Sequence, residues 1–285
     1  MKKSILNIST ILLLLSMLSS CGLEKEIDLD LPAYDNKLVL ECYLEPGQPM
    51  ALLLTRASDY FSPFPKDLNG FVEGILEQGA TVEIRHKGQT FQLKNQLTFN
   101  PVTQRVFNYS AQNLVPEDYQ SPFELYITTA DGKTIAATTQ LLPVVPIDSV
   151  VVQYQENDTL ARVLTYFTDD RNQTNYYRRV LHHSSFRDSI PDQDFVVDDR
   201  LADNGVFVFG TGYDFAPGDT VFTSLFHINR VYYNFLESLT NAVSSNGNPF
   251  GQPSPIISDL QGTAGAIGIF TGLSYDRQRV IIKDP

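Results

Sequence analysis

The sequence predicts a mainly β protein, in which an N-terminal immunoglobulin-like or prealbumin-like β-sandwich precedes a second β-rich domain that carries one amphipathic helix. Short runs of alternating, β-branched or aromatic residues recur along the chain, and turn residues separate them. Only one long stretch places its apolar residues at helical spacing. A segment with two prolines divides the strand-like runs into two groups, which indicates two domains.

The first group contains strand-like runs joined by hairpin turns. The clearest unit alternates over 123–129 and again over 134–138, and Asp131-Gly132 between them suits a turn that needs positive φ. A second hairpin is predicted at Lys87-Gly88. The runs of this group occupy residues 37–44, 49–56, 80–85, 88–94, 105–109, 122–129 and 133–139.

The segment Leu-Pro-Val-Val-Pro at 142–146 marks the predicted boundary, because neither proline can donate a hydrogen bond to a sheet. It separates a first domain at 36–143 from a second domain at 144–285. Strand-like runs continue beyond it, at residues 147–155, 161–168, 176–183, 195–198, 206–209 and 220–228.

One amphipathic helix is predicted near residues 228–243, and Ser-Ser-Asn-Gly at 244–247 ends its periodic run. We expect its apolar stripe to pack on the second sheet, as the stripe of a surface helix normally does. The alternative is that the aromatic members of the stripe form the wall of a ligand site. The stripe comprises Ile228, Val231, Tyr232, Phe235, Leu236, Leu239 and Val243.

Residues 1–20 have the layout of a secretory signal peptide. Lys2 and Lys3 precede a largely apolar run over 5–18, which is shorter than the roughly 18 to 20 residues of a transmembrane helix. The run ends Leu-Ser-Ser-Cys, and this resembles the bacterial lipobox, in which the cysteine receives a diacylglyceryl group. We therefore expect cleavage before Cys21 and a lipid anchor there, with palmitate or similar acyl chains. The alternative is an ordinary signal peptide with a cysteine near its cut site.

The segment 21–35 is expected to be a lipidated tether between the membrane and the folded body. It begins with a polar, charged stretch that is short of aromatic residues, as in flexible segments. Acidic residues beside Lys25 resemble the signals that send lipoproteins of Bacteroidota to the outer face of the outer membrane. We therefore expect a lipid-anchored protein on the outer membrane that faces outward.

The mature chain is acidic. The formal charge is −12, and removal of residues 1–20 lowers the 21 basic residues to 19 against 33 acidic ones, a net charge of −14. Binding to nucleic acid or docking on anionic lipid needs a basic surface, so both kinds of partner are disfavoured. Acylation of Cys21 leaves Cys42 as the one free thiol, and the alternating run around it predicts a small buried side chain rather than a nucleophile.

The sequence contains no Gly-x-Ser-x-Gly, His-Glu-x-x-His, Cys-x-x-Cys or Walker motif. The glycines of 262–268 lack the dinucleotide-binding spacing, and we expect a tightly packed final strand there. His182 and His183 lie in a strand pattern, where neighbours point to opposite faces and so do not share a metal ion. No catalytic, cofactor-binding or metal-binding residue is predicted, and no cofactor is expected.

Carboxylates and tyrosines offer weaker alternatives. Acidic clusters could supply oxygen ligands for calcium or the carboxyl pair of a glycosidase, although solvated loop acids are the expectation. Four tyrosines could stack on sugar rings, although we expect them to bridge core and surface. The acidic residues are Asp169, Asp170, Asp192, Asp194, Asp198, Asp199 and Asp203, and the tyrosines are Tyr176, Tyr177, Tyr232 and Tyr233.

Two further motifs, together with the lipobox, resemble a known family. The first is Ile-Asp-Leu-Asp-Leu-Pro-Ala-Tyr at 27–34, which leads into Lys-Leu-Val-Leu-Glu at 37–41. The second runs from Asn-Pro-Phe at 248–250 to Ile-Gly-Ile-Phe at 267–270. They are similar to the Bacteroidota outer-membrane lipoproteins that contain domain of unknown function 4249. Cys42 stands where that family commonly has glycine, a difference to which we attach no functional consequence.

The resemblance implies a gene neighbourhood with TonB-dependent receptors and an accessory role in capture or import, but no particular ligand. We therefore expect a noncatalytic accessory or ligand-capture partner of a TonB-dependent transporter, with a nutrient as the candidate ligand. Two alternatives stay open, a surface hydrolase with an acidic site and an adhesion or structural lipoprotein, because a fold does not fix a function. A pocket that gathers two or more of the named aspartates would favour the hydrolase.

Overall fold

The computed structural model describes residues 37–57, 67, 70, 74–100, 104–156, 158–186, 190–201, 205–245 and 254–285. The expected signal peptide, Cys21 and the tether lie outside these residues. The first strands along the chain are β1 (Leu38–Leu44), β2 (Pro49–Arg56), β3 (Thr81–His86), β4 (Gln89–Asn100), β5 (Arg105–Leu114), β6 (Phe123–Thr128) and β7 (Thr134–Thr139).

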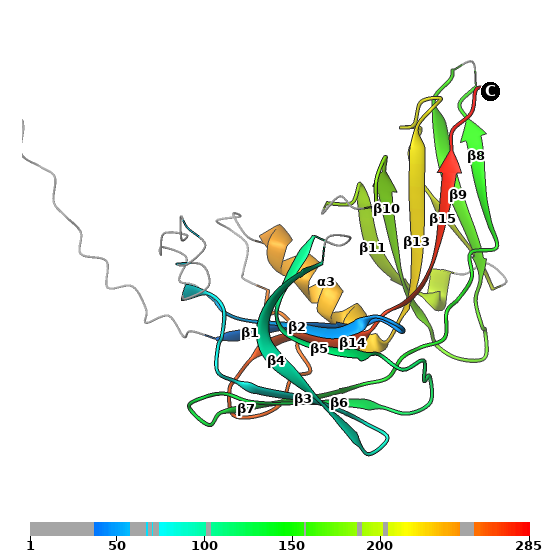
Figure 1. Ribbon diagram of the computed structural model, residues 1–285. Coiled ribbons are helices and arrows are strands. Elements are labelled where there is room, and N and C mark those ends of the chain that lie inside the picture. Colours follow the sequence, from blue (N-terminus) through cyan, green and yellow to red (C-terminus); the bar gives the residue numbers. More distant parts are fainter. Residues whose placement is uncertain are drawn as a thin grey trace, which may run out of the picture. The chain divides into compact units, whose positions relative to one another are not determined.

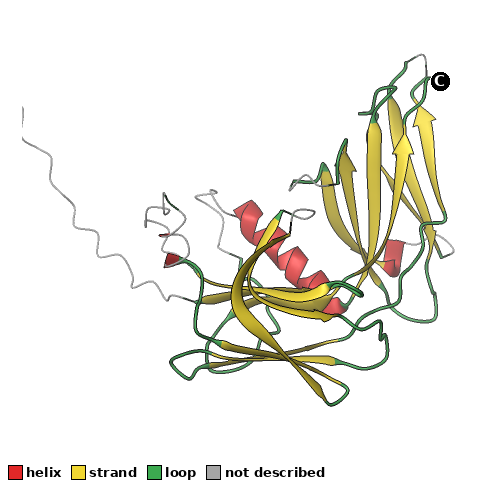
Figure 2. Ribbon diagram, in the orientation of Figure 1, coloured by secondary structure: helices red, strands yellow, loops and turns green. Residues whose placement is uncertain are grey.

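The later elements are mainly strands as well. They are β8 (Ser149–Tyr154), β9 (Ala161–Thr168), β10 (Tyr176–His183), β11 (Gln193–Asp198), the short 3₁₀ helix η2 (Asp199–Leu201), β12 (Val206–Gly210), β13 (Thr220–Ile228), α3 (Arg230–Ser245), β14 (Ile267–Gly272) and β15 (Ser274–Ile281). Figure 2 shows the predominance of strands over helices. The prediction of a mainly β fold with sandwich sheets and one amphipathic helix is therefore confirmed.

The first sandwich is one sheet folded onto itself, with the strand order β14-β1-β2-β5-β4-β3-β6-β7. The long strand β4 pairs with β3 through its first half and with β5 through its second half, and the register shifts between Asn95 and Thr98. Figure 1 shows β4 curving from one layer to the other. Alternate residues of β1 are buried, and its inward side chains pack with those of β3 and β6 in a largely aliphatic core.

The predicted hairpin turns occur where the sequence places them. Lys87 and Gly88 both have positive φ values, of 48° and 75°, and join β3 to β4. Gly132 has a φ of 81° and lies in the turn between β6 and β7. Local turn chemistry therefore sets the register of both hairpins.

The second sandwich packs the sheet β11-β10-β13-β15 against the three-stranded sheet β12-β9-β8. Its interior is rich in rings, with Phe167, Tyr177, Phe207 and Phe209 in one cluster. The outer face of β10 and β13 packs on α3, where Val180, Phe226, Ile228, Tyr232 and Phe235 are buried together.

Strand β14 returns from the second half of the chain to the first sandwich, where it pairs with β1 in parallel. Gly268 allows this approach, since its φ is 136° and an added Cβ would lie 1.9 Å from the carbonyl oxygen of Leu40. This strand comes from the region 144–285 that the sequence assigned to a second domain, and it completes the sheet of the first sandwich. The chain does not end with this glycine-containing strand, because β15 follows it.

Candidate functional site

The candidate site is a cavity of about 400 Å³ lined by α3, the outer face of β1, β14, and the strands β10 and β11. Asn229 fixes the start of α3, because its Oδ1 accepts a hydrogen bond of 2.8 Å from the backbone N–H of Tyr232. The helix therefore begins at a defined residue and presents one face to the cavity.

One wall of the cavity is apolar. Phe235 and Leu236 precede Leu239 by four and three residues on α3, so all three lie on one side of the helix. Ile256 and Ile267 continue this apolar surface from the segment that leads into β14. The wall supplies a surface on which an apolar group can be buried.

The opposite wall comes from β1. Because successive strand residues point to opposite faces, Val39, Glu41 and Tyr43 face outward while Leu40 and Cys42 fill the first core. Burial raises the pKa of Tyr43 well above its ordinary value, and Tyr232 and Glu41 act in the same direction. Its phenol is therefore neutral at physiological pH and can donate a hydrogen bond.

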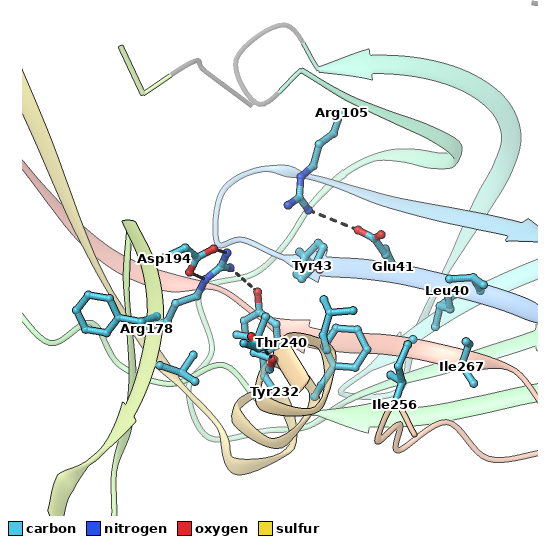
Figure 3. A pocket seen from close by; sticks show the side chains of 17 residues that line it. Leu40, Glu41, Tyr43, Arg105, Arg178, Asp194, Tyr232, Thr240, Ile256 and Ile267 are labelled. Atoms are coloured by element: carbon cyan, nitrogen blue, oxygen red, sulfur yellow. Dashed lines mark hydrogen bonds and ion pairs between the residues drawn. The ribbon is translucent and has the colours of Figure 1, made fainter. Parts of the chain in front are cut away.

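A tight ion pair closes one end of the cavity (Figure 3). Nε and Nη2 of Arg178 donate to the two oxygens of Asp194 at 2.7 and 2.5 Å, and Nη1 donates to the Tyr232 hydroxyl at 2.7 Å. Burial by itself lowers the pKa of Arg178, but the hydrogen bonds and charge of Asp194 outweigh it and raise the pKa above its usual value. This arginine stays charged and is held in one orientation.

A second pair of opposite charges lies on β1 and β5. Arg105 is the first residue of β5, and its Nη1 lies 3.8 Å from Oε2 of Glu41. The guanidinium also lies over the ring of Tyr43, with 4.8 Å between its carbon and the ring centroid. The two side chains retain 46% and 42% of their exposure, so both can still reach a ligand.

A family model, described as "Domain of unknown function (DUF4249)", matches residues 24–279. This chain belongs to the DUF4249 family. The match spans both sandwiches, the helix and every residue of the cavity wall. It confirms the DUF4249 membership that the sequence motifs indicated.

Other comparisons add little to this assignment. A comparison with curated proteins gives no match. Among solved structures, the chain is similar to the FN1–FN3 domains of chicken CNTN1, at 8% identity and a TM-score of 0.27, with 85% of this chain and 65% of that chain covered. A two-domain fibronectin type-III segment of chicken tenascin matches at 11% identity and a TM-score of 0.20, with 68% and 91% covered. The DUF4249 chain thus spans slightly less than two thirds of the CNTN1 fragment.

The structure separates most of the residues that the sequence singled out. Cys42 is fully buried, as expected for a small core side chain, and burial raises the pKa of its thiol. Nε2 of His183 lies 3.2 Å from Asp219. The part of the chain that the structure describes contains no group of three or more His, Cys, Asp or Glu residues arranged to hold a metal ion.

The described acidic residues that the sequence singled out in this DUF4249 chain are hydrogen-bonded to neighbouring side chains and backbone groups. Asp169 is buried and accepts hydrogen bonds from Tyr177 and Asn175, while Asp192 accepts one from the backbone N–H of His183. Only Asp194, of the described aspartates that the sequence singled out, lines the main cavity, and it is paired with Arg178. Asp203 lies outside the described residues. Asp169 and Asp170 accept hydrogen bonds from the side chain of Asn175, and Asp199 accepts one from its backbone N–H, so these three aspartates lie close together outside the cavity. The cavity itself contains one of the named aspartates that the structure describes and not the two or more that would favour a hydrolase there.

The tyrosines and the predicted helix stripe have mixed positions, because Ile228 belongs to β13 and Val231, Leu239 and Val243 remain exposed. Tyr177 lies inside the second sandwich, and Tyr176 and Tyr233 contact each other with ring centroids 4.8 Å apart. Tyr232 and Phe235 pack on the second sheet and also line the cavity, so part of the stripe serves both as core and as a wall of the candidate site.

Sequence reasoning did not identify Glu41, Arg105 or Arg178 as members of a site. One signal was available in β1, where Glu41 and Tyr43 alternate with buried apolar residues. The two side chains therefore lie on the outer face of the strand, which a single sandwich would leave in solvent. Their partial burial shows that a further element covers this face. The sequence gives no sign that this element is α3.

No helix within the described residues is both long and apolar enough to cross a membrane.

Proposed function

We propose that this DUF4249 chain is a lipoprotein of the outer membrane, anchored through Cys21 and facing outward, that captures a small ligand for a TonB-dependent transporter. One observation carries the capture role, namely the cavity of about 400 Å³ with an apolar wall and paired charges. Small-molecule sites are typically concave, mostly apolar and lined by a few polar groups that orient the ligand. The sequence of residues 18–21 supports the anchor.

The lipid anchor and the transporter are tested together on native outer membranes. We expect the tagged chain, solubilised in mild detergent, to begin at an acylated Cys21 and to retain one barrel protein in fixed ratio, both determined by mass spectrometry. Cys21→Ala should lose the acyl chains and leave the membrane fraction.

The chain supplies a matched control, because Cys42 is its other cysteine and is buried in the first core. Cys42→Ala should keep both the acylation and the barrel protein. Membrane retention of the Cys21→Ala chain would contradict the anchor, and recovery of the acylated chain without any barrel protein would contradict the transporter.

A further inference from the structure

The two charged pairs at the cavity differ in how fully they are engaged. Arg178 makes a two-bond contact with Asp194 and a third hydrogen bond to Tyr232, and its side chain is only 17% exposed. Arg105 and Glu41 approach no closer than 3.8 Å, and each is nearly half exposed. The second pair therefore has donors and acceptors to offer to a ligand, whereas the first is already occupied.

The spacing of Arg105 and Glu41 restricts the charge of that ligand. A carboxylate bound to Arg105 would also lie close to the Glu41 carboxylate, and the two like charges would repel. An isolated ammonium bound to Glu41 would meet the same opposition from Arg105. A head group with both charges avoids both costs, since each charge then faces an opposite one.

The separation of the ligand's own charges follows from the same geometry. Nη1 of Arg105 and Oε2 of Glu41 are 3.8 Å apart, so the ammonium and carboxylate of the ligand must also be close together. An α-amino acid meets this requirement because both groups are attached to one carbon atom. The apolar surface of Leu236, Leu239 and Ile256 then selects a large apolar side chain.

We propose that the cavity binds an α-amino acid with a large apolar side chain, with its carboxylate on Arg105, its ammonium on Glu41 and its side chain against α3. The proposal rests on the proposed function only in taking the cavity as a ligand site. Tyr43 lies under the Arg105 guanidinium and keeps it in place over the cavity.

Isothermal titration calorimetry with L-leucine tests this on the purified mature chain. We expect Arg105→Gln and Glu41→Gln each to weaken leucine binding about 10-fold, because each loses one charge-assisted contact. Leucine amide and N-acetyl-leucine, which lack one charge each, should bind the unchanged protein about 10-fold more weakly than leucine. Arg279→Gln and Glu156→Gln make the same chemical changes at exposed positions away from the cavity and should bind leucine normally.

One readout separates ligand contact from a structural role of the pair. Glu41→Gln removes the repulsion against a lone carboxylate, so N-acetyl-leucine should bind this variant more tightly than it binds the unchanged protein, although leucine binds it more weakly. A variant that was merely misfolded would lose both. Circular dichroism and thermal melting confirm the fold of each variant.

The proposal is overturned if leucine fails to bind at millimolar concentration, if N-acetyl-leucine binds as well as leucine, or if neither cavity substitution affects binding. The transporter has an independent test. Retention of the barrel protein without leucine binding would overturn the ligand class alone, whereas leucine binding without a barrel protein would overturn the transporter alone.

Discussion

The two sandwiches are filled differently. The first has a largely aliphatic interior, in which side chains such as Leu40, Leu52 and Ile84 interlock. The second is packed with rings, and the centroid of Phe167 lies 4.8 to 5.3 Å from those of Tyr177, Phe207 and Phe209. Both sandwiches also contain buried polar side chains, and two of these, Asn108 and Arg179, differ in how completely they are hydrogen-bonded.

Asn108 in the first sandwich is fully hydrogen-bonded. Its Oδ1 accepts from the Leu54 N–H, and its Nδ2 donates to the carbonyls of Leu54 and Glu77, at 2.8 to 2.9 Å. It thereby adds side-chain hydrogen bonds to the short backbone pairing between β2 and the segment 75–77. A buried amide with all its bonds made is compatible with a stable core.

Arg179 in the second sandwich is less well satisfied. It is fully buried, contacts the side chains of Gln193 and Thr223, and has no carboxylate partner among the described residues. Burial lowers its pKa to about 10. The comparison teaches that burial alone does not show whether a polar side chain stabilises the fold, since the completeness of its hydrogen bonds decides the sign.

Of the substitutions that test this comparison, Asn108→Leu should change the free energy of unfolding most. The substitution leaves the Leu54 N–H without its partner and removes one of the two hydrogen bonds accepted by each of the carbonyls of Leu54 and Glu77, so we expect the free energy of unfolding to fall by about 2 kcal/mol. Urea denaturation measures the change. Asn95→Leu removes one hydrogen bond of 3.3 Å from an exposed residue and should cost well under about 1 kcal/mol. Equal losses in the two variants would contradict the role assigned to Asn108.

Arg179→Met should have a smaller effect of opposite sign. Replacing a buried, incompletely bonded cation by an apolar side chain of similar length should raise the free energy of unfolding by about 1 kcal/mol. The adjacent Arg178→Met is the matched control and should lower it by about 1 kcal/mol, because Asp194 then loses its partner. A loss of stability in Arg179→Met would show that the comparison between the two interiors is wrong.

The smallest expected effect is the contribution of His227 to the pH dependence of stability. Its ring lies between the carbonyl of Pro143 and Oδ1 of Asn175, at 2.9 and 3.2 Å. Burial lowers its pKa, so below the ordinary value near 6.5 the unfolded chain binds the proton more readily than the folded one. Stability should therefore decrease as the pH falls from about 7 toward the folded-state pKa.

His227→Gln should flatten that decrease when urea denaturation is repeated at several pH values. The variant removes the titrating ring and keeps a polar side chain that can reach one of the two oxygens. An unchanged slope would assign the pH dependence to other groups.

The sequence by itself determined most of the strands, because alternation and turn chemistry are local. The run of β1 buries every second residue, and Lys87-Gly88 adopts the positive φ values that a tight hairpin needs. The sequence did not predict the strand β15, because its residues depend on contacts with a distant part of the chain. Its polar residues Asp276 and Gln278 form hydrogen bonds with the backbone of Ile147, so polar side chains occur where a strand pattern would have apolar ones.

Tertiary structure alone decided the cavity and its charges. Glu41, Arg105 and Arg178 are more than 60 residues apart in the sequence, and they meet because α3 covers the outer face of β1 and because β14 returns to pair with that strand. A periodic pattern shows which face of an element is apolar, but it does not show which distant element will cover it. The positions of these charges depend on that long-range packing.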